Sequence, residues 1–140
     1  MPAPLTGNDR FALADLAARY AVAVDRREFA LLRDVFTDDA ELDTGRALRT
    51  GIAAIIEAME GLRRYVATSH VVGQQRRAFD DDELTGIVYC EAHHLTDHGD
   101  HRTDKVMHIH YHDRYVATPA GWRIGRRALD IRWTDETIVG

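Results

Sequence analysis

The sequence predicts an α+β fold in which a curved antiparallel sheet packs against three N-terminal helices. Helical periodicity is confined to about the first 64 residues, and the remainder shows long strands joined by tight turns. Helices followed by hairpin-linked strands are typical of this class. Long strands must curl around the helices to bury a core, so a pocket is expected between the two layers. The length corresponds to one domain, residues 1–140.

The first predicted helix starts at Asn8 or Asp9, because either side chain can accept hydrogen bonds from the free N–H groups of the first turn. Asp25 falls at the end of this helix, at the edge of its apolar stripe, where a carboxylate is costly unless it is paired. Asp25 is therefore either the partner of another buried polar group or part of the turn that ends the helix. The stripe consists of Leu13, Leu16, Ala17, Tyr20, Ala21 and Val24.

Two further helices and five strands complete the predicted order of elements. The helices are expected at residues 28–36 and at 51–64, the second capped by Thr50. The strands are expected at residues 40–43, 68–79, 84–96, 105–118 and 122–133.

The last predicted strand carries apolar residues on both faces. Under strict alternation Ile124 and Ala128 lie on one face, and Leu129, Ile131 and Trp133 lie on the other. A sheet that is apolar on both faces normally has both covered. We therefore expect a second subunit on the outer face, in a homodimer or a homotrimer.

Composition excludes several classes of partner. The formal net charge of −5 argues against nucleic acids and anionic membranes. No apolar run approaches the roughly 20 residues that a membrane-spanning helix needs. The single cysteine, Cys90, excludes an intrachain disulfide and, with no signal-peptide pattern at the N-terminus, predicts a cytoplasmic location.

Eight histidines raise the question of a metal site. His108, His110 and His112 alternate along one predicted strand, but strand rise spreads them over about 13 Å, too far for one ion. The chain has no His-Glu-x-x-His motif, no paired cysteines and no nicotinamide motif. We expect no metal and no cofactor, and we interpret these histidines as a half-exposed polar strand face.

His70 begins the first long strand, in the stretch Thr68-Ser69-His70-Val71-Val72-Gly73. A histidine between core and solvent can titrate near neutrality, as a general base must. The alternative is a core histidine bonded to the backbone. A carboxylate on the second ring nitrogen would fix the tautomer and stabilise the imidazolium. Such a pair can remove a proton next to a carbonyl group.

The order of motifs along the chain resembles the SnoaL-like group of the nuclear-transport-factor-2-like superfamily. Residues 20–29 and 34–40 resemble the opening of that group. Tyr111-His112-Asp113 and residues 121–127 resemble its tyrosine strand and its Gly-Trp-Arg hairpin. The resemblance covers nearly the whole chain and implies a cone-shaped, cystatin-like α+β barrel.

Within this group the chain is most similar to the scytalone dehydratase and bile-acid dehydratase branch. The resemblance implies that Asp25 and His70 are the catalytic pair and that Tyr20 is the helix tyrosine. It also implies that His94 is a second catalytic histidine, with His93 taking that place after a register shift of one residue. Tyr20, His94 or the imidazolium that forms on His70 could then supply the proton that a leaving hydroxyl group needs.

These observations predict a cofactor-free lyase of the dehydratase type, or an isomerase, acting on a small apolar cyclic, polyketide-like or steroid-like substrate. Gln74, four residues after His70 on the same strand face, is expected to bind the substrate. Tyr111 is expected beside it, or in the core, and Trp133 is expected to close the apolar wall. The alternatives are a non-catalytic ligand-binding or assembly subunit, like those of ring-hydroxylating dioxygenases, and a polyketide cyclase.

Overall fold

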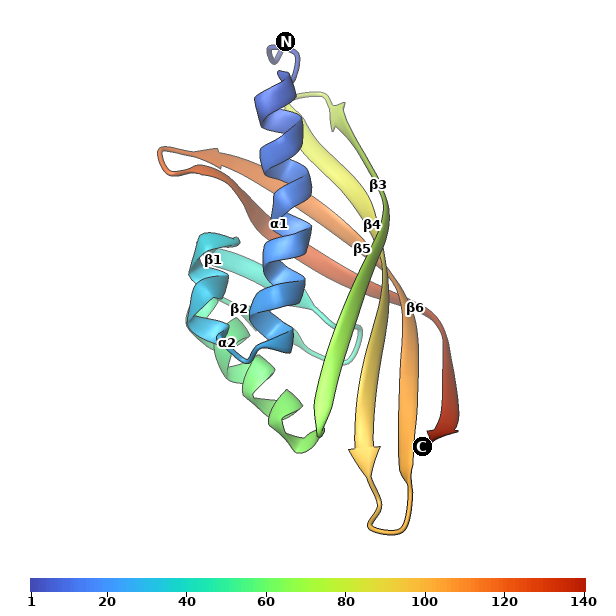
Figure 1. Ribbon diagram of the computed structural model, residues 1–140. Helices are drawn as coiled ribbons and strands as arrows, with labels where there is room; N and C mark the ends of the chain where they lie inside the picture. The colour runs from blue at the N-terminus through green and yellow to red at the C-terminus, as the bar shows by residue number, and fades with distance from the viewer.

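Six strands form one curved sheet, and the helices cover one of its faces (Figure 1). The structure is a computed structural model that describes residues 1–140. The α+β class and the curved sheet predicted from the sequence are confirmed. The elements are α1 (Gly7–Asp25), the 3₁₀ helix η1 (Phe29–Asp34), β1 (Phe36–Asp43), β2 (Leu48–Thr50), α2 (Ile52–Glu60), the 3₁₀ helix η2 (Gly61–Arg64), β3 (Ala67–Asp80), β4 (Glu83–Asp97), β5 (Arg102–Thr118) and β6 (Gly121–Val139).

The strands lie in the order β2-β1-β6-β5-β4-β3, so β2 and β3 form two open edges and the sheet does not close into a barrel. All neighbouring pairs are antiparallel except β1 and β6, which are parallel. The prediction of a wholly antiparallel sheet is wrong for that pair. The sequence does not predict β2, because its three exposed residues show no apolar alternation.

Helix α1 is capped by Thr6, and not by Asn8 or Asp9. The Thr6 hydroxyl accepts the Asp9 N–H at 3.0 Å, and the Asp9 carboxylate accepts the Thr6 N–H at 2.9 Å. This capping box satisfies two N–H groups at the start of the helix. All six residues of the predicted apolar stripe, from Leu13 to Val24, are buried. Its packing against the sheet brings Asp25, in the last turn, close to the start of β3.

The other two predicted helices are shorter than expected. The segment predicted as the second helix forms only η1, with Phe29 and Leu32 buried. The third breaks into α2 and η2 at Gly61, a residue that disfavours helix. Its N-cap is Gly51 at φ 90°, a conformation that favours glycine, and not the predicted Thr50.

Three β-bulges interrupt the alternation of side chains in the antiparallel strand pairs, and the parallel pair of β1 and β6 has a further register shift between Phe36 and Glu41. One lies in β3, where Gly73 and Gln74 together oppose Tyr89. Two lie in β6, where Gly125 and Arg132 are each an extra residue relative to β5. After a bulge, a residue expected on one face lies on the other.

The bulges in β6 reverse two predicted positions. Ile124 pairs with Tyr115 and is completely buried on the inner face, whereas Ala128, predicted on the same face, pairs with the outward-facing His112. Trp133 pairs with His108 on the outer face and is 57 % exposed. Strict alternation is therefore wrong for Ile124 and Trp133.

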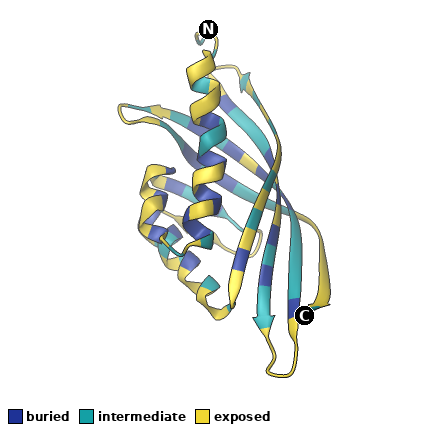
Figure 2. Ribbon diagram, viewed as in Figure 1, coloured by how far each residue is buried: buried dark blue, intermediate teal, exposed yellow.

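Buried segments of the sheet lie where α1 crosses it (Figure 2). The core contains a buried ion pair between Arg127 and Asp113. Arg127 donates Nε and Nη2 to the two carboxylate oxygens of Asp113, at 2.8 Å each, and both side chains are inaccessible to solvent. The Arg127 guanidinium carbon lies 4.4 Å from the ring centre of Tyr20 and 3.9 Å from that of Tyr111. This cluster joins α1, β5 and β6.

Replacing Asp113 by Asn should lower the free energy of unfolding by about 3–5 kcal/mol, because the Arg127 charge then stays buried without a counter-charge. Urea denaturation followed by circular dichroism measures the change. The control is Asp15→Asn, which breaks the exposed 2.7 Å pair with Arg19 and should cost less than about 1 kcal/mol. Equal losses in the two variants would contradict this account of the core.

Candidate functional site

Asp25, at the end of α1, and His70, near the start of β3, are joined by hydrogen bonds. His70 Nδ1 lies 2.7 Å from Asp25 Oδ1, and the His70 backbone N–H donates to Oδ2 at 2.8 Å. The Thr68 hydroxyl donates to Oδ1 at 2.9 Å. The side chain of His70 is 6 % exposed and that of Asp25 is 23 % exposed. The carboxylate is therefore held at both oxygens, at the edge of the core.

The protonation of this pair follows from its contacts. Partial burial acts to raise the pKa of Asp25, but the hydrogen bonds from the ring and backbone of His70 outweigh it, and the pKa lies below the ordinary value. Asp25 is thus ionised at neutral pH and can only accept hydrogen bonds. His70 Nδ1 must then carry the ring proton, which leaves a free lone pair on Nε2. This is the tautomer that a general base requires.

Aromatic side chains surround the His70 ring. Tyr20 meets it edge-on with 6.2 Å between ring centres, and Tyr111 packs against Tyr20 at 5.7 Å. Both tyrosines are buried. Burial raises the pKa of Tyr20, and the Arg127 charge opposes this without reversing it. Tyr20 is therefore protonated at neutral pH and can act as a proton donor.

His94, and not His93, faces the pair. Its ring centre is 6.2 Å from that of His70, and its Nδ1 donates to the backbone carbonyl of Lys105 at 3.1 Å. Burial lowers the pKa of His94, so at neutral pH the ring is neutral with a free Nε2. His93 lies on the outer face, where its Nδ1 is 2.7 Å from Asp104 Oδ2.

Two predicted substrate-binding residues lie away from the pair. The bulge in β3 turns Gln74 to the outer face, and Gln75 takes the inward position. Trp133 stacks on His108 with 4.3 Å between ring centres. Gln74 and Trp133 both line a hollow of about 320 Å³ on the outer face, named here the outer hollow. Placing them beside His70 is wrong, because the prediction assumes alternation without bulges.

Arg127 is the residue of this region that sequence reasoning missed. Its Nη1 has no hydrogen-bond partner, although the atom is buried beneath Tyr20 and Tyr111. The available signal was an arginine at an inward position of an otherwise apolar strand face. A buried guanidinium with a free N–H beside two phenols can stabilise negative charge that develops there.

Residues 6–128 match the SnoaL-like domain family. The chain belongs to this family. It is 32% identical over 125 residues to the uncharacterized protein Rv2910c of Mycobacterium tuberculosis, across 86% of this chain and 83% of that protein.

Several solved structures have the same fold as this SnoaL-like domain. The Kfla4162 protein of Kribbella flavida aligns with TM-score 0.84 and 25% identity over 91% of this chain and 93% of that one. A protein provisionally named scytalone dehydratase, from Novosphingobium aromaticivorans, aligns with TM-score 0.80 and 22% identity over 94% and 89%. Hexachlorocyclohexane dehydrochlorinase LinA-type3 from Novosphingobium barchaimii aligns with TM-score 0.79 and 19% identity over 91% and 89%. The last two comparisons establish the fold alone.

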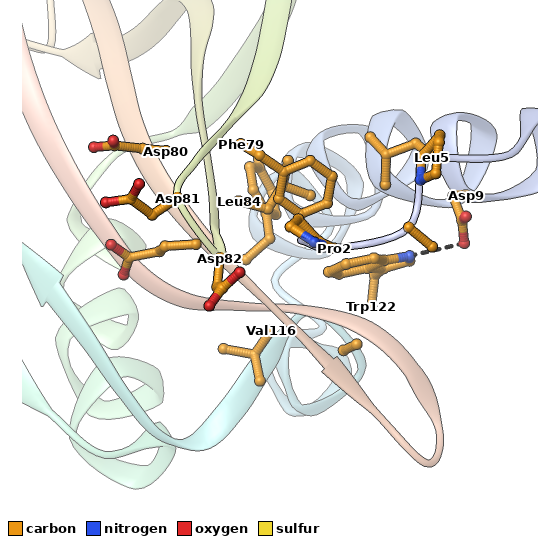
Figure 3. A pocket seen from close by; sticks show the side chains of 15 residues that line it. Pro2, Leu5, Asp9, Phe79, Asp80, Asp81, Asp82, Leu84, Val116 and Trp122 are labelled. Atoms are coloured by element: carbon orange, nitrogen blue, oxygen red, sulfur yellow. Dashed lines mark hydrogen bonds between the residues drawn. The ribbon is translucent and has the colours of Figure 1, made fainter.

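A large hollow of this SnoaL-like domain lies at the other end of α1 (Figure 3). It has a volume of about 850 Å³, apolar walls that include Phe79, Leu84 and Trp122, and an acidic rim at residues 80–83. The 19 residues of α1 separate it from the pair by about 28 Å. Neither this hollow nor the outer hollow is lined by Asp25 or His70.

The remaining histidines of the sheet lie on its outer face beside carboxylates. His108 Nε2 is 3.0 Å from an oxygen of Asp135, and His112 Nε2 is 3.8 Å from one of Asp130. No three His, Cys, Asp or Glu side chains are grouped closely enough to hold a metal ion. None of the helices combines the length and hydropathy of a membrane-crossing segment.

Replacing Thr68 by Val should raise the pKa of Asp25, because the carboxylate loses the hydrogen bond from the Thr68 hydroxyl. The pKa is measured from the carboxyl ¹³C chemical shift of Asp25 during a pH titration. The pKa of Asp25 is depressed in the folded chain. Its stabilising effect is therefore present above the unfolded value of about 3.9 and is lost as the pH falls through the folded value. The variant should lose less stability than the parent in urea denaturation between about pH 5 and pH 2.

The matched control is Ser69→Ala, which removes an exposed hydroxyl from the next residue of β3, on the opposite face. It should leave the pKa of Asp25 unchanged. An identical Asp25 titration in the Thr68→Val variant and the parent would contradict the hydrogen-bond assignment.

Proposed function

We propose that this SnoaL-like domain catalyses elimination from, or isomerisation of, a small apolar cyclic, polyketide-like or steroid-like substrate without a cofactor. The observation that carries the proposal is the His70 ring, whose Nδ1 is held by an ionised Asp25 and whose Nε2 is free. An assembly subunit has no need of such a charge, which costs free energy at the edge of the core.

In the proposed reaction, His70 Nε2 takes a proton from a carbon next to a carbonyl group. The electron pair of the broken C–H bond forms a carbon–carbon double bond, and a hydroxyl group on the next carbon leaves. Tyr20 donates the proton with which that hydroxyl departs as water, and the imidazolium of His70 returns a proton to Tyr20 through solvent. General acid–base steps of this kind contribute about 10²–10⁴-fold each.

Tyr20 suits the role of acid better than His94 does. A neutral His94 whose Nδ1 proton is held by a backbone carbonyl presents an acceptor at Nε2, so it can orient a substrate hydroxyl but cannot protonate it. The Arg127 charge beneath the Tyr20 ring stabilises the negative charge that the phenol oxygen gains while it donates.

The names of two structural neighbours support the reaction class. A dehydratase and a dehydrochlorinase both carry out eliminations, of water and of hydrogen chloride. Because the leaving groups of these two reactions differ, the neighbours do not indicate which group leaves the substrate of this chain. A base on the substrate carbon is common to both eliminations, and this is the role we assign to His70.

Replacing His70 by Ala should reduce turnover by about 10²–10⁴-fold with the fold retained, and Asp25→Asn should also be severely impaired because the tautomer is no longer fixed. The assay is a screen of hydroxylated cyclic ketones and steroid-like or polyketide-like compounds for loss of water by mass spectrometry. Turnover should persist in a chelator. If His70→Ala converted an active substrate at the parent rate, the mechanism would be refuted.

The chain provides a matched control in its second Asp–His pair. His93 and Asp104 are also 2.7 Å apart, but they lie on the outer face. His93→Ala and Asp104→Asn should therefore leave turnover unchanged. Equal losses from the two pairs would mean that the substitutions act through stability and not through chemistry.

A non-catalytic binding or assembly role is the second candidate, and the location of the hollows favours it. The outer hollow is not lined by Asp25 or His70, and it is bordered by exposed apolar side chains. A polyketide cyclase remains the third alternative and would use the same base. We retain the prediction of a cytoplasmic location, which rests on the single cysteine.

We propose that a second copy of the chain covers the outer hollow, in a homodimer or homotrimer. Val71, Tyr89 and Trp133 are 51 %, 39 % and 57 % exposed around it. Trp133→Glu should reduce the sedimentation mass to that of one 15.8 kDa chain, because a carboxylate cannot be buried unpaired. Phe11→Glu, at an exposed aromatic position on α1, is the control and should keep the parent mass. A parent protein of one-chain mass at micromolar concentration would refute the assembly.

A further inference from the structure

Lys105 is the only lysine in the chain. The other 17 of its 18 lysine and arginine residues are arginines. It lies on the inner face of the sheet. Lys105 of β5 pairs with His94 of β4, and His94 pairs with Thr68 of β3. Directly opposed residues share a face of the sheet. The His94 ring faces His70, so Lys105 extends from the face that carries the Asp25–His70 pair.

Lys105 takes part in none of the 14 ion pairs in the structure. Glu136, directly opposite on β6 and on the same face, is exposed and forms no ion pair either. Lys105 is partly exposed. An ammonium that no carboxylate contacts can attract an anion supplied from outside the chain.

The charge acts on the interior of the site. Burial is the main cause of the lowered pKa of His94, and the positive charge of Lys105 lowers it further. The ammonium and the His94 ring therefore interact electrostatically in a partly desolvated region. In such a region an opposite charge is attracted more strongly than it would be in bulk water.

We propose that Lys105 forms an anion subsite beside the Asp25–His70 pair and binds the carboxylate of a small apolar acid. The inference rests on the proposed function and narrows its substrates to acids. Adjacent strands are about 4.8 Å apart, and Lys105 on β5 lies two strand spacings across and two residues along the strand from His70 on β3, so their Cα atoms are roughly 12 Å apart. A carboxylate at Lys105 and a reacting carbon at His70 therefore fit within one molecule the size of a substituted six-membered ring.

The single lysine makes the subsite directly observable. Reductive methylation with ¹³C-formaldehyde labels one side chain, Lys105, besides the terminal amine, and the methylated amine keeps its charge. The probes are cyclohexanecarboxylate and cyclohexanecarboxamide, which match in shape but differ in charge. The Lys105 resonance should shift saturably with the carboxylate and not with the carboxamide.

Calorimetry with the same probes tests the subsite by substitution. Lys105→Met keeps an unbranched side chain without the charge, and it should weaken carboxylate binding at least tenfold, or about 1.4 kcal/mol. Arg102→Met removes a charge from the same strand on the opposite face, where Arg102 is paired with Asp97, and it should leave the affinity unchanged. Thermal denaturation verifies that both variants are folded.

The outcomes separate this inference from the proposed reaction. His70→Ala should retain carboxylate binding, and Lys105→Met should raise KM for an acid substrate while largely preserving kcat. If Lys105 governs binding but His70→Ala does not affect turnover, the subsite stands and the reaction falls. The subsite is refuted if the parent protein does not bind cyclohexanecarboxylate at millimolar concentration, or if it binds the carboxylate and the carboxamide equally. It is also refuted if the parent and Lys105→Met bind the carboxylate with the same affinity.

Discussion

The guanidinium of Arg127 is the constraint around which the core is arranged. A permanent charge with no access to water must be neutralised locally. Asp113, directly opposite on β5, supplies two hydrogen bonds of 2.8 Å, and the rings of Tyr20 and Tyr111 lie against the guanidinium. Because Tyr20 belongs to α1, this cluster fixes how α1 lies on the sheet. The last turn of that helix, with Asp25, is positioned by the same contact.

The two Asp–His pairs show that environment, and not contact distance, distinguishes a candidate catalytic pair from a surface pair. Both have a ring nitrogen 2.7 Å from a carboxylate oxygen. The His70 side chain is 6 % exposed and surrounded by aromatic rings, whereas that of His93 is 33 % exposed on the outer face. Partial exclusion of water strengthens the interaction of an imidazolium with its carboxylate. The inner pair can therefore retain a transferred proton near a bound substrate.

The two faces of the sheet have separate roles because three bulges divide the long strands. The bulges turn Gln74 and Trp133 outward, where they border the outer hollow, and they turn Ile124 into the core. The inner face then carries His70, His94 and Lys105 in adjacent rows of the sheet. The inner face thereby carries His70 and the side chains next to it, and the outer face carries the exposed apolar side chains around the outer hollow.

The sequence by itself determined the first helix, the long strands, the α+β class, the apolar stripe of α1 and the family, because helical periodicity and short motifs are local properties of the chain. It also indicated Asp25 and His70, since a polar residue at the edge of a buried segment must find a partner. Only the tertiary structure decided which residues share the inner face. A bulge adds one residue to a strand and reverses every later side chain, and its position depends on pairing with the neighbouring strand. The choice of His94 over His93, the exclusion of Gln74 and Trp133, and the burial of Arg127 against Asp113 all follow from that pairing.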